Sequence, residues 1–322
     1  MQYLRSSETG TGDSLELGLR RRYQKDEQGR NERNRTVSGS HRASHLGSRV
    51  RGIIAFSKTG ATTADKLKLM IAGYARGHNF GGRDLIGRIG RKLFPEISAR
   101  LTLPGKPKLS VNLCDLSQLS VAEEIFVERV YDLERIPFAP DLILDCGAHT
   151  GMFTLLASSK FPNVKIVAFE PDPENSRWLR RQVSENRLPV EIVQAAVATS
   201  NGEVLFNAGH GCGSSISINS AESPNAIRVK TVNLADYLSP NINLVLKIDI
   251  EGSEEILLPG IAAFLPTKTY IFLETHGGRQ SWDRLSQLLI ERGFTTNVTR
   301  CRETYTDGTA IRTEPMKASG DR

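Results

Sequence analysis

LILDCGAHTG, residues 142–151, joins a short apolar run to a loop that contains two glycines. The run at 142–144 has the length and composition of a buried strand. The loop at 145–151 precedes an apolar segment at 152–159, so its glycines permit a tight turn from a strand into a helix. The first N–H groups of such a helix favour a phosphate or a carboxylate. The stretch therefore predicts the first strand–loop–helix unit of an α/β sheet, with a ligand site at the loop.

Strand and helix patterns alternate after this unit, which is typical of a parallel sheet built from βαβ units. Further strands are predicted at 164–169, 190–193, 244–250, 270–273, 295–298 and 310–313, and further helices at 174–186, 254–264 and 282–292. Two segments, 204–207 and 227–232, resemble an inserted hairpin. The order predicts an α/β fold with a doubly wound, mostly parallel sheet, in which ligands bind beyond the carboxyl ends of the strands.

The chain divides by composition into a tail, an extension and a main domain. We predict a basic, disordered tail at 1–60, an N-terminal helical and strand extension at 61–120, the main domain at 121–315 and a second tail at 316–322. The first tail could be an arm that binds polyanions or membranes, or a solvated tail without function. In the extension, 108–113 alternates like a strand. Ser120 and Glu123 have the spacing of a capping box, which predicts a helix from Ser120 through Val130.

Charge is unevenly distributed along the 322 residues. The net charge is +6, from 42 Lys+Arg and 36 Asp+Glu. Residues 1–108 contain 22 basic and 9 acidic side chains, a net charge of +13, whereas residues 109–322 contain 20 basic and 27 acidic ones, a net charge of −7. A mildly acidic main domain argues against a protein that coats nucleic acid with its whole surface.

The cysteines and the hydropathy suggest where the protein works. The four cysteines are scattered, with no pairing that suggests a disulfide framework and no spacing of a zinc site, so no metal is predicted. No run approaches the roughly 18 apolar residues of a membrane span, and the first residues lack the pattern of a signal peptide. We therefore expect a soluble, cytoplasmic protein.

A carboxylate follows the second predicted strand, where a nucleoside ligand would lie. Glu170 stands 25 positions after Asp145, at the end of the strand at 164–169. A carboxylate at this place can accept hydrogen bonds from both ribose hydroxyls. After the third strand, Ala196 is small enough to leave room for an adenine ring. The D-x-G-x-x-x-G spacing of the loop at 145–151 differs from the G-x-G-x-x-G of dinucleotide-binding proteins, so these residues predict a different nucleoside cofactor.

Charged residues also follow the next two strands of the predicted sheet. Lys247, Asp249 and Glu251 alternate on one side of a strand that should be buried on both faces. Such charges are costly in a core unless they are paired or face a cleft. Glu274 and His276 follow the next strand, and a histidine there is a candidate base at neutral pH. The alternatives are a buried set of ion pairs and a loop histidine without function.

These motifs, in this order, resemble the FkbM family of S-adenosylmethionine-dependent methyltransferases. The resemblance extends over about 121–294 and rests on the segments 145–151, 168–173 and 247–254. It departs from the family pattern at His149, where Asn is usual, and at Ser253, where Ala is usual. It implies a Rossmann-like methyltransferase sheet with S-adenosyl-L-methionine as the cofactor.

The resemblance also implies functions for individual residues. The methionine part of the cofactor would contact Asp145, Gly147 and Gly151, and its ribose would contact Glu170. Ala148, His149 and Ala196 are the other residues predicted to bind the cofactor. The implied reaction is methylation of a hydroxyl on a sugar, a glycan or a secondary metabolite. Asp249 is the first candidate for the base that takes the hydroxyl proton, and His276 is the second. Lys247, Glu251 and Glu274 are predicted to hold the substrate.

Alternative predictions remain for one loop and for the function of the chain. The glycine-rich loop at 209–215 is predicted to be a lid or an acceptor contact, with an inert linker as the alternative. A protein that binds or modifies nucleic acid could use the basic tail as its electrostatic footprint, but no base-methylation tetrapeptide of the Asn-Pro-Pro-Tyr type occurs. The missing G-x-G-x-x-G argues against a nicotinamide-dependent oxidoreductase, and intact cofactor motifs argue against a non-catalytic scaffold.

Overall fold

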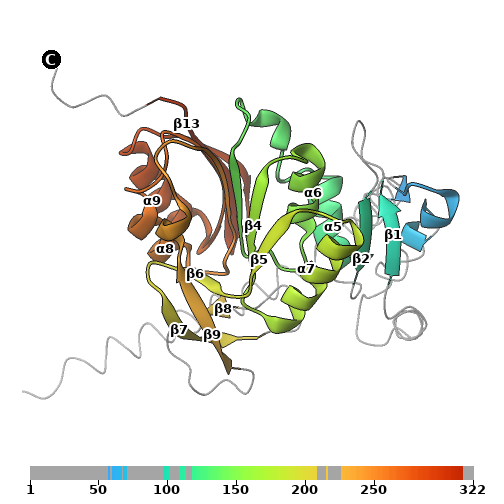
Figure 1. Cartoon of the computed structure of the whole chain (residues 1–322). Coiled ribbons are helices and arrows are strands. Elements are labelled where there is room, and N and C mark those ends of the chain that lie inside the picture. The colour runs from blue at the N-terminus through green and yellow to red at the C-terminus, as the bar shows by residue number, and fades with distance from the viewer. Residues whose placement is uncertain are drawn as a thin grey trace, which may run out of the picture. The chain divides into compact units, whose positions relative to one another are not determined.

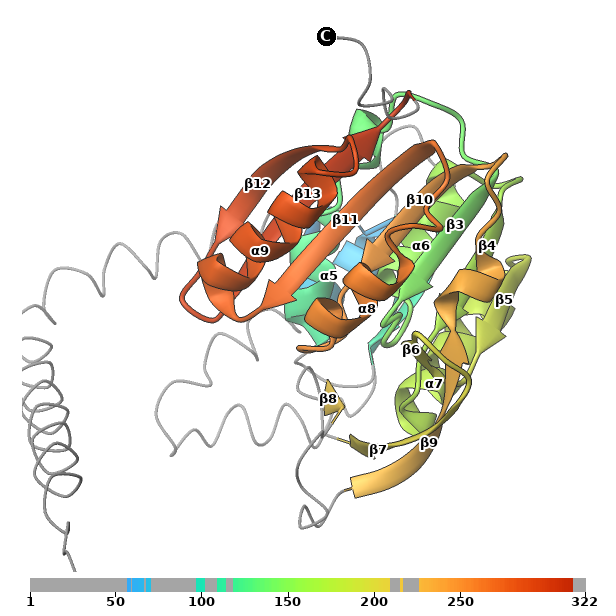
Figure 2. The ribbon, with the colours of Figure 1, turned by 90° about the vertical axis from the view of Figure 1, so that its left-hand side faces the viewer.

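A seven-stranded sheet forms the centre of the computed structural model, and its strand order is β12-β13-β11-β10-β3-β4-β5 (Figures 1 and 2). Its strands are β3 (Leu142–Cys146), β4 (Lys165–Phe169), β5 (Val190–Val193), β10 (Asn243–Ile248), β11 (Lys268–His276), β12 (Thr295–Cys301) and β13 (Tyr305–Arg312). Neighbours from β11 to β5 pair in parallel, while β13 is antiparallel to both of its neighbours. The predicted doubly wound, mostly parallel sheet is confirmed.

The structure describes residues 57–58, 60–66, 68–70, 97–101, 109–113, 118–208, 215–216 and 226–314. The described residues all lie in one compact unit. The predictions for the two tails and for the loop at 209–215 lie outside the described residues, apart from 57, 58, 60 and 215. Within the part of the chain that is described, no helix is long and apolar enough to cross a membrane.

Helices cover both faces of the sheet. One face is covered by α5 (Gln118–Phe126), α6 (Met152–Lys160) and α7 (Pro173–Glu185), and the other by α8 (Glu254–Ile261) and α9 (Gly278–Ile290) (Figure 1). Two short 3-10 turns are η1 (Leu133–Arg135) and η2 (Leu234–Tyr237). Ile143 of β3 belongs to the core under α5 and α6, and its neighbour Leu144 belongs to the core under α8 and α9. Because both faces are covered, the strands are continuous apolar runs in the sequence.

Two smaller sheets accompany the central one. β1 (Ile97–Leu101) and β2 (Leu109–Leu113) form an antiparallel pair, and β6 (Ala196–Ala198), β7 (Gly202–Asn207), β8 (Ser215–Ile216) and β9 (Ala226–Asn233) form a sheet in the order β6-β9-β7-β8. The antiparallel pairing of β7 with β9 confirms the predicted inserted hairpin. The main chain of Asn112 in β2 exchanges hydrogen bonds of 2.9 and 2.8 Å with the side chain of Gln182 in α7, so this part of the extension is fixed to the sheet's helices.

The helix predicted from Ser120 through Val130 has different ends. It is α5, which begins at Gln118 and ends at Phe126. Ser120 therefore lies inside the helix, and the predicted capping box is wrong. Arg129 has a φ of 57°, in the left-handed region, so the chain turns away before Val130.

The strand predicted at 244–250 ends earlier, at Ile248. Glu251 and Gly252 have φ values of 53° and 101°, so the chain leaves the sheet in a left-handed turn. Asp249 and Glu251 consequently lie in this turn, at the carboxyl end of β10, and the prediction that they belong to the strand is wrong. The correction moves both carboxylates out of the core and toward the edge of the sheet.

The order of the strands determines where a ligand site forms. The chain proceeds from β3 outward through β4 to β5, and then returns to β10 on the other side of β3. In open α/β sheets, ligands bind at such a reversal, beyond the carboxyl ends of the strands. The ends of β3, β4, β10 and β11 lie at this edge. Residues that the sequence singled out follow β3, β4 and β10, whereas Glu274 and His276 belong to β11 itself, so the prediction that they follow this strand is wrong.

Candidate active site

A cavity of about 520 Å³ lies at this edge of the sheet. Its lining includes ten of the predicted site residues: Gly147, Ala148, His149, Glu170, Ala196, Lys247, Asp249, Glu251, Glu274 and His276. The two others, Asp145 and Gly151, are not among the lining residues. The structure thus brings most of the predicted cofactor and substrate residues to one cavity and places two of them behind it.

The glycines of the loop after β3 have different structural functions. Gly147 has a φ of 78°, and a Cβ added there would lie 1.9 Å from the carbonyl oxygen of Asp249. Gly151 has a φ of 92°, and its added Cβ would lie 2.6 Å from Cδ1 of Leu179 in α7. Gly147 therefore permits the loop to approach the turn after β10, whereas Gly151 permits the start of α6 to pack against α7.

Asp145 and Lys247 form a buried pair behind this loop. Asp145 is fully buried and accepts a hydrogen bond from the hydroxyl of Thr154. Lys247 is also buried; its Nζ lies 3.5 Å from Asp145 Oδ1 and donates to the carbonyl oxygen of Gly147 at 2.6 Å. Burial alone would lower the pKa of Lys247, but Asp249 and Asp145 raise it well above its usual range. Lys247 is therefore a permanent cation that holds the loop, and its contacts favour positioning over direct binding of the acceptor.

Glu170 connects the end of β4 to the same loop. Its carboxylate accepts hydrogen bonds from the N–H of His149 at 2.7 Å and from the N–H of Asp172 at 2.9 Å. The side chain is buried, and this burial raises its pKa to about 7 despite the two N–H donors. The carboxylate thus lies at the cavity and is close to half ionised at neutral pH.

Two donor groups contact the same carboxylate oxygen of Asp249. Lys247 Nζ lies 3.3 Å from its Oδ2, and the hydroxyl of Tyr131 donates to the same atom at 3.4 Å. Burial would raise the pKa of Asp249, but Lys247, and to a smaller extent His276, lower it below its usual range. Sequence reasoning missed Tyr131, because it lies in an irregular segment after α5 and meets Asp249 only through tertiary packing.

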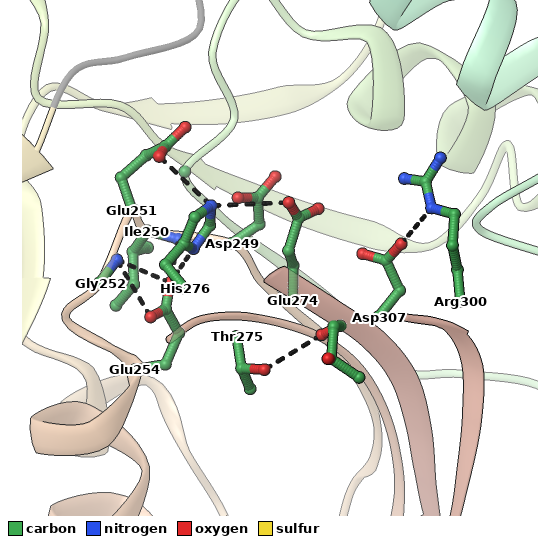
Figure 3. A network of polar contacts seen from close by, with 12 residues as sticks. Asp249, Ile250, Glu251, Gly252, Glu254, Glu274, Thr275, His276, Arg300 and Asp307 are labelled. Atoms are coloured by element: carbon green, nitrogen blue, oxygen red, sulfur yellow. Dashed lines mark hydrogen bonds and ion pairs between the residues drawn. The ribbon is translucent and has the colours of Figure 1, made fainter. Parts of the chain in front are cut away.

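His276 lies at the centre of a network of carboxylates (Figure 3). Its Nδ1 is 3.0 Å from Glu254 Oε1, and its Nε2 is 3.2 Å from Glu251 Oε2 and 3.5 Å from Glu274 Oε1. Burial would lower the pKa of His276, but Glu254 and the other carboxylates raise it to about 9. The imidazole is therefore protonated at neutral pH, and both of its nitrogens are donors.

Glu254 is a second residue that sequence reasoning missed, because it was treated only as the start of a helix. Its buried carboxylate accepts hydrogen bonds from the N–H groups of Ile250 and Gly252 as well as contacting His276 (Figure 3). One carboxylate therefore fixes the turn that carries Asp249 and Glu251, and at the same time orients the imidazole. Its position at the first turn of α8 also suits the helix dipole.

Glu274 lies between Asp249 and the β12–β13 hairpin. Burial, and then the nearby carboxylates of Asp249 and Asp307, raise the pKa of Glu274 well above its usual range, so its carboxyl holds a proton at neutral pH. Asp307 is paired with Arg300, which lies close beside it in Figure 3. Burial likewise raises the pKa of Glu251, to about 7, although His276 opposes this shift.

One group in the described part of the chain has the composition of a metal site. Asp249, Glu274 and His276 each offer a ligand atom, and these atoms lie within 4.8 Å of one another. However, the Lys247 ammonium already lies beside Asp249, and the His276 imidazole is protonated at neutral pH. Both features oppose a cation at this place, and the sequence-based expectation of no metal stays a prediction.

The chain is similar to known methyltransferases. Residues 145–296 match the family model described as "Methyltransferase FkbM domain". The "31-O-demethyl-FK506 methyltransferase FkbM" of Streptomyces tacrolimicus is 28% identical over 208 residues, which is 53% of this chain and 80% of that protein. The "Hexuronic acid methyltransferase AglP" of Haloferax volcanii is 25% identical over 169 residues, 50% of this chain and 66% of that protein.

A fungal relative extends the comparison. "Methyltransferase 1" of Beauveria bassiana is 27% identical over 166 residues, which is 44% of this chain and 66% of that protein. The chain thus spans just under two thirds of the length of two of these three relatives. The matched family segment begins at Asp145 and ends at Thr296, so it includes the cofactor loop and the network around His276.

Proposed function

We propose that this chain methylates a hydroxyl of a sugar or a secondary metabolite with S-adenosylmethionine as the methyl donor. Its residues 145–296 match the FkbM methyltransferase family model, as the motifs predicted. The main support for the proposal is that residues of the loop at 145–151 and of the Asp249–His276 network line the same cavity. The names of the relatives, one for a demethylated FK506 and one for a hexuronic acid, support an acceptor from these two classes.

The residues of the cavity fit S-adenosylmethionine. Gly147 keeps the loop close to the turn after β10, and Glu170 places a carboxylate where ribose hydroxyls can donate to it. Ala196 leaves room beside them for a flat ring. The surplus of carboxylates suits a sulfonium cation. When bound, the cofactor supplies a methyl group activated by the sulfonium, which is transferred to the acceptor oxygen to leave neutral S-adenosylhomocysteine.

We assign the acceptance of the hydroxyl proton to Asp249. Lys247 and Tyr131 both contact its Oδ2, so Oδ1 is the oxygen left to face an acceptor hydroxyl. The depressed pKa keeps the carboxylate ionised at neutral pH, whereas the imidazolium of His276 has no site for a further proton. His276 would instead hold the carboxylates of Glu251 and Glu254 in position beside the acceptor. Alignment of the acceptor with the cofactor is the larger contribution to the rate.

The affinity for S-adenosylmethionine is expected to fall about tenfold between pH 8 and pH 6. Glu170, with a pKa of about 7, is ionised above this pH and protonated below it, and only the carboxylate can accept from both ribose hydroxyls. Calorimetric titrations at three pH values would measure the effect. Glu170→Gln should bind more weakly and lose that part of the pH dependence; the same dependence in Glu170→Gln would contradict the assignment.

The proposed function is tested by transfer of a labelled methyl group from S-adenosylmethionine into a metabolite and glycan extract, followed by mass spectrometry of the labelled product. Label on a hydroxyl oxygen is the expected result. Folded wild-type protein that fails to bind S-adenosylmethionine in calorimetry would overturn the proposal. Label found in nucleic acid instead would favour the alternative in which the basic N-terminal residues engage a polyanion.

A further inference from the structure

One wall of the cavity comes from residues outside the segment that matches the family. It consists of Val121, Glu124, Ile125, Val130 and Tyr131 from α5 and the turn after it, and of Arg300, Thr304 and Tyr305 from the β12–β13 hairpin. Arg300 joins the two parts: its guanidinium is paired with Asp307 in the hairpin and lies 3.4 Å from Glu124 Oε1 in α5. This wall, called the outer wall below, adjoins the Asp249–His276 network, because the hydroxyl of Tyr131 contacts Asp249.

The outer wall presents apolar surface with one fixed aromatic ring. Tyr131 makes edge-to-face contacts with Phe153 and Phe272, with ring centroids 5.1 and 5.6 Å apart. Ile125 of α5 is largely buried beside it. Because the ring is held on two sides, its orientation does not depend on a ligand. Such a surface suits the apolar face of a ring or macrocycle.

The lysine and the arginine that line the cavity, and the protonated His276, each have two or more carboxylate partners. The pairs are Lys247 with Asp145 and Asp249, His276 with Glu251 and Glu254, and Arg300 with Asp307 and Glu124. With Glu274 beside His276 and Glu128 beside Arg300, eight carboxyl groups thus surround these three cations among the described residues. An anionic group on the acceptor would find no lysine or arginine in this lining that lacks a partner, and it would face carboxylates instead.

We propose that the outer wall is the acceptor subsite and that it selects an uncharged, hydroxyl-bearing acceptor with an apolar face over an anionic one. The inference rests on the proposed function. It restricts the acceptor, whether a sugar or a secondary metabolite, to uncharged molecules. Acceptor hydroxyls would donate to the carboxylates near His276, while carbon-bound faces of the acceptor would pack on Tyr131. A neutral acceptor can contact both the carboxylates near His276 and the ring of Tyr131. A carboxylate group on the acceptor matches neither of these surfaces.

Two probes that differ in a single group test this selection. Octyl β-D-glucopyranoside and octyl β-D-glucopyranosiduronic acid would be titrated calorimetrically, at about pH 7.5, into full-length protein loaded with S-adenosylhomocysteine. The neutral glycoside is expected to bind at least about tenfold more tightly. Equal or tighter binding of the uronic acid, or no binding of the glycoside, would overturn the proposal. Failure of the first step, the binding of S-adenosylhomocysteine, would instead count against the proposed function.

Variants of the outer wall test its charged part and its aromatic part separately. Glu124→Gln removes one partner of Arg300, so the preference for the neutral probe should narrow to about threefold. Glu174→Gln is the matched control, because its exposed ion pair with Arg177 lies on α7 and its side chain does not line the cavity. Tyr131→Ala should weaken binding of the octyl glycoside by at least about fivefold without changing the affinity for S-adenosylhomocysteine. Tyr131→Phe keeps the ring, so this loss of glycoside affinity should not occur in it. Unchanged glycoside affinity in Tyr131→Ala would overturn the placement of the acceptor.

Discussion

Replacing Gly147 with alanine is expected to abolish measurable binding of S-adenosylmethionine and to lower the free energy of unfolding by about 3 kcal/mol or more. The new Cβ would lie 1.9 Å from the carbonyl oxygen of Asp249 and 3.0 Å from its carbonyl carbon. These neighbours are main-chain atoms, so no side-chain rotation relieves the contact. The loop and the turn after β10 would have to separate, which also breaks the hydrogen bond from Lys247 to the Gly147 carbonyl.

Gly252→Ala provides the control for this prediction. Gly252 also has a positive φ, 101°, but an added Cβ would meet no atom within 4 Å. Its replacement therefore costs backbone strain alone, about 1 kcal/mol, and cofactor affinity should stay within a few-fold of wild type. Denaturant unfolding and calorimetry on both variants would separate strain from collision. Wild-type cofactor binding by Gly147→Ala would contradict the close approach of loop and turn.

The ligand edge of the sheet could be predicted from the sequence because its residues follow recognisable strands. Glu170 follows one apolar run, and Glu274 and His276 follow another, so parallel pairing alone brings them to one edge. Gly147 could be found for the same reason, since a turn from a strand into a helix restricts the residues it can contain. In each case a local pattern and the sheet topology were sufficient.

Contacts that depend on packing could not be predicted in this way. Tyr131 contacts Asp249 across 118 positions in the chain, and no periodicity marks the segment in which it lies. Glu254 acts on the site because two residues with positive φ, Glu251 and Gly252, turn the chain so that main-chain N–H groups point toward its carboxylate. The family resemblance implies that Asp145 contacts the cofactor, and this stays a prediction; its contacts with Thr154 and Lys247 could not be predicted, because they depend on packing.

Replacing Asp249 with asparagine is expected to lower kcat by a factor of about 10²–10⁴ while leaving the affinity for S-adenosylmethionine within about threefold. Asparagine has a similar shape and can still accept from Lys247 and Tyr131, but its amide cannot take a proton from the acceptor. Single-turnover transfer of a labelled methyl group would measure the chemical step, and calorimetry would measure cofactor binding. Loss of cofactor affinity equal to the loss of kcat would show that Asp249 only maintains the structure.

The pH profile of kcat distinguishes Asp249 from His276 as the base. The pKa of Asp249 lies below its usual range, so a reaction that depends on its carboxylate should have a nearly constant kcat from pH 6 to pH 8. The pKa of His276 is about 9, so a reaction that needs its neutral imidazole should become about tenfold faster with each pH unit in this range. The profile is recorded at saturating cofactor in wild type and in Glu251→Gln, because burial raises the pKa of Glu251 to about 7. We expect the flat profile, with His276→Gln lowering kcat by only about tenfold, because the variant loses contacts that hold the carboxylates of Glu251 and Glu254. A steep rise that disappears in His276→Gln would transfer the base function to the histidine.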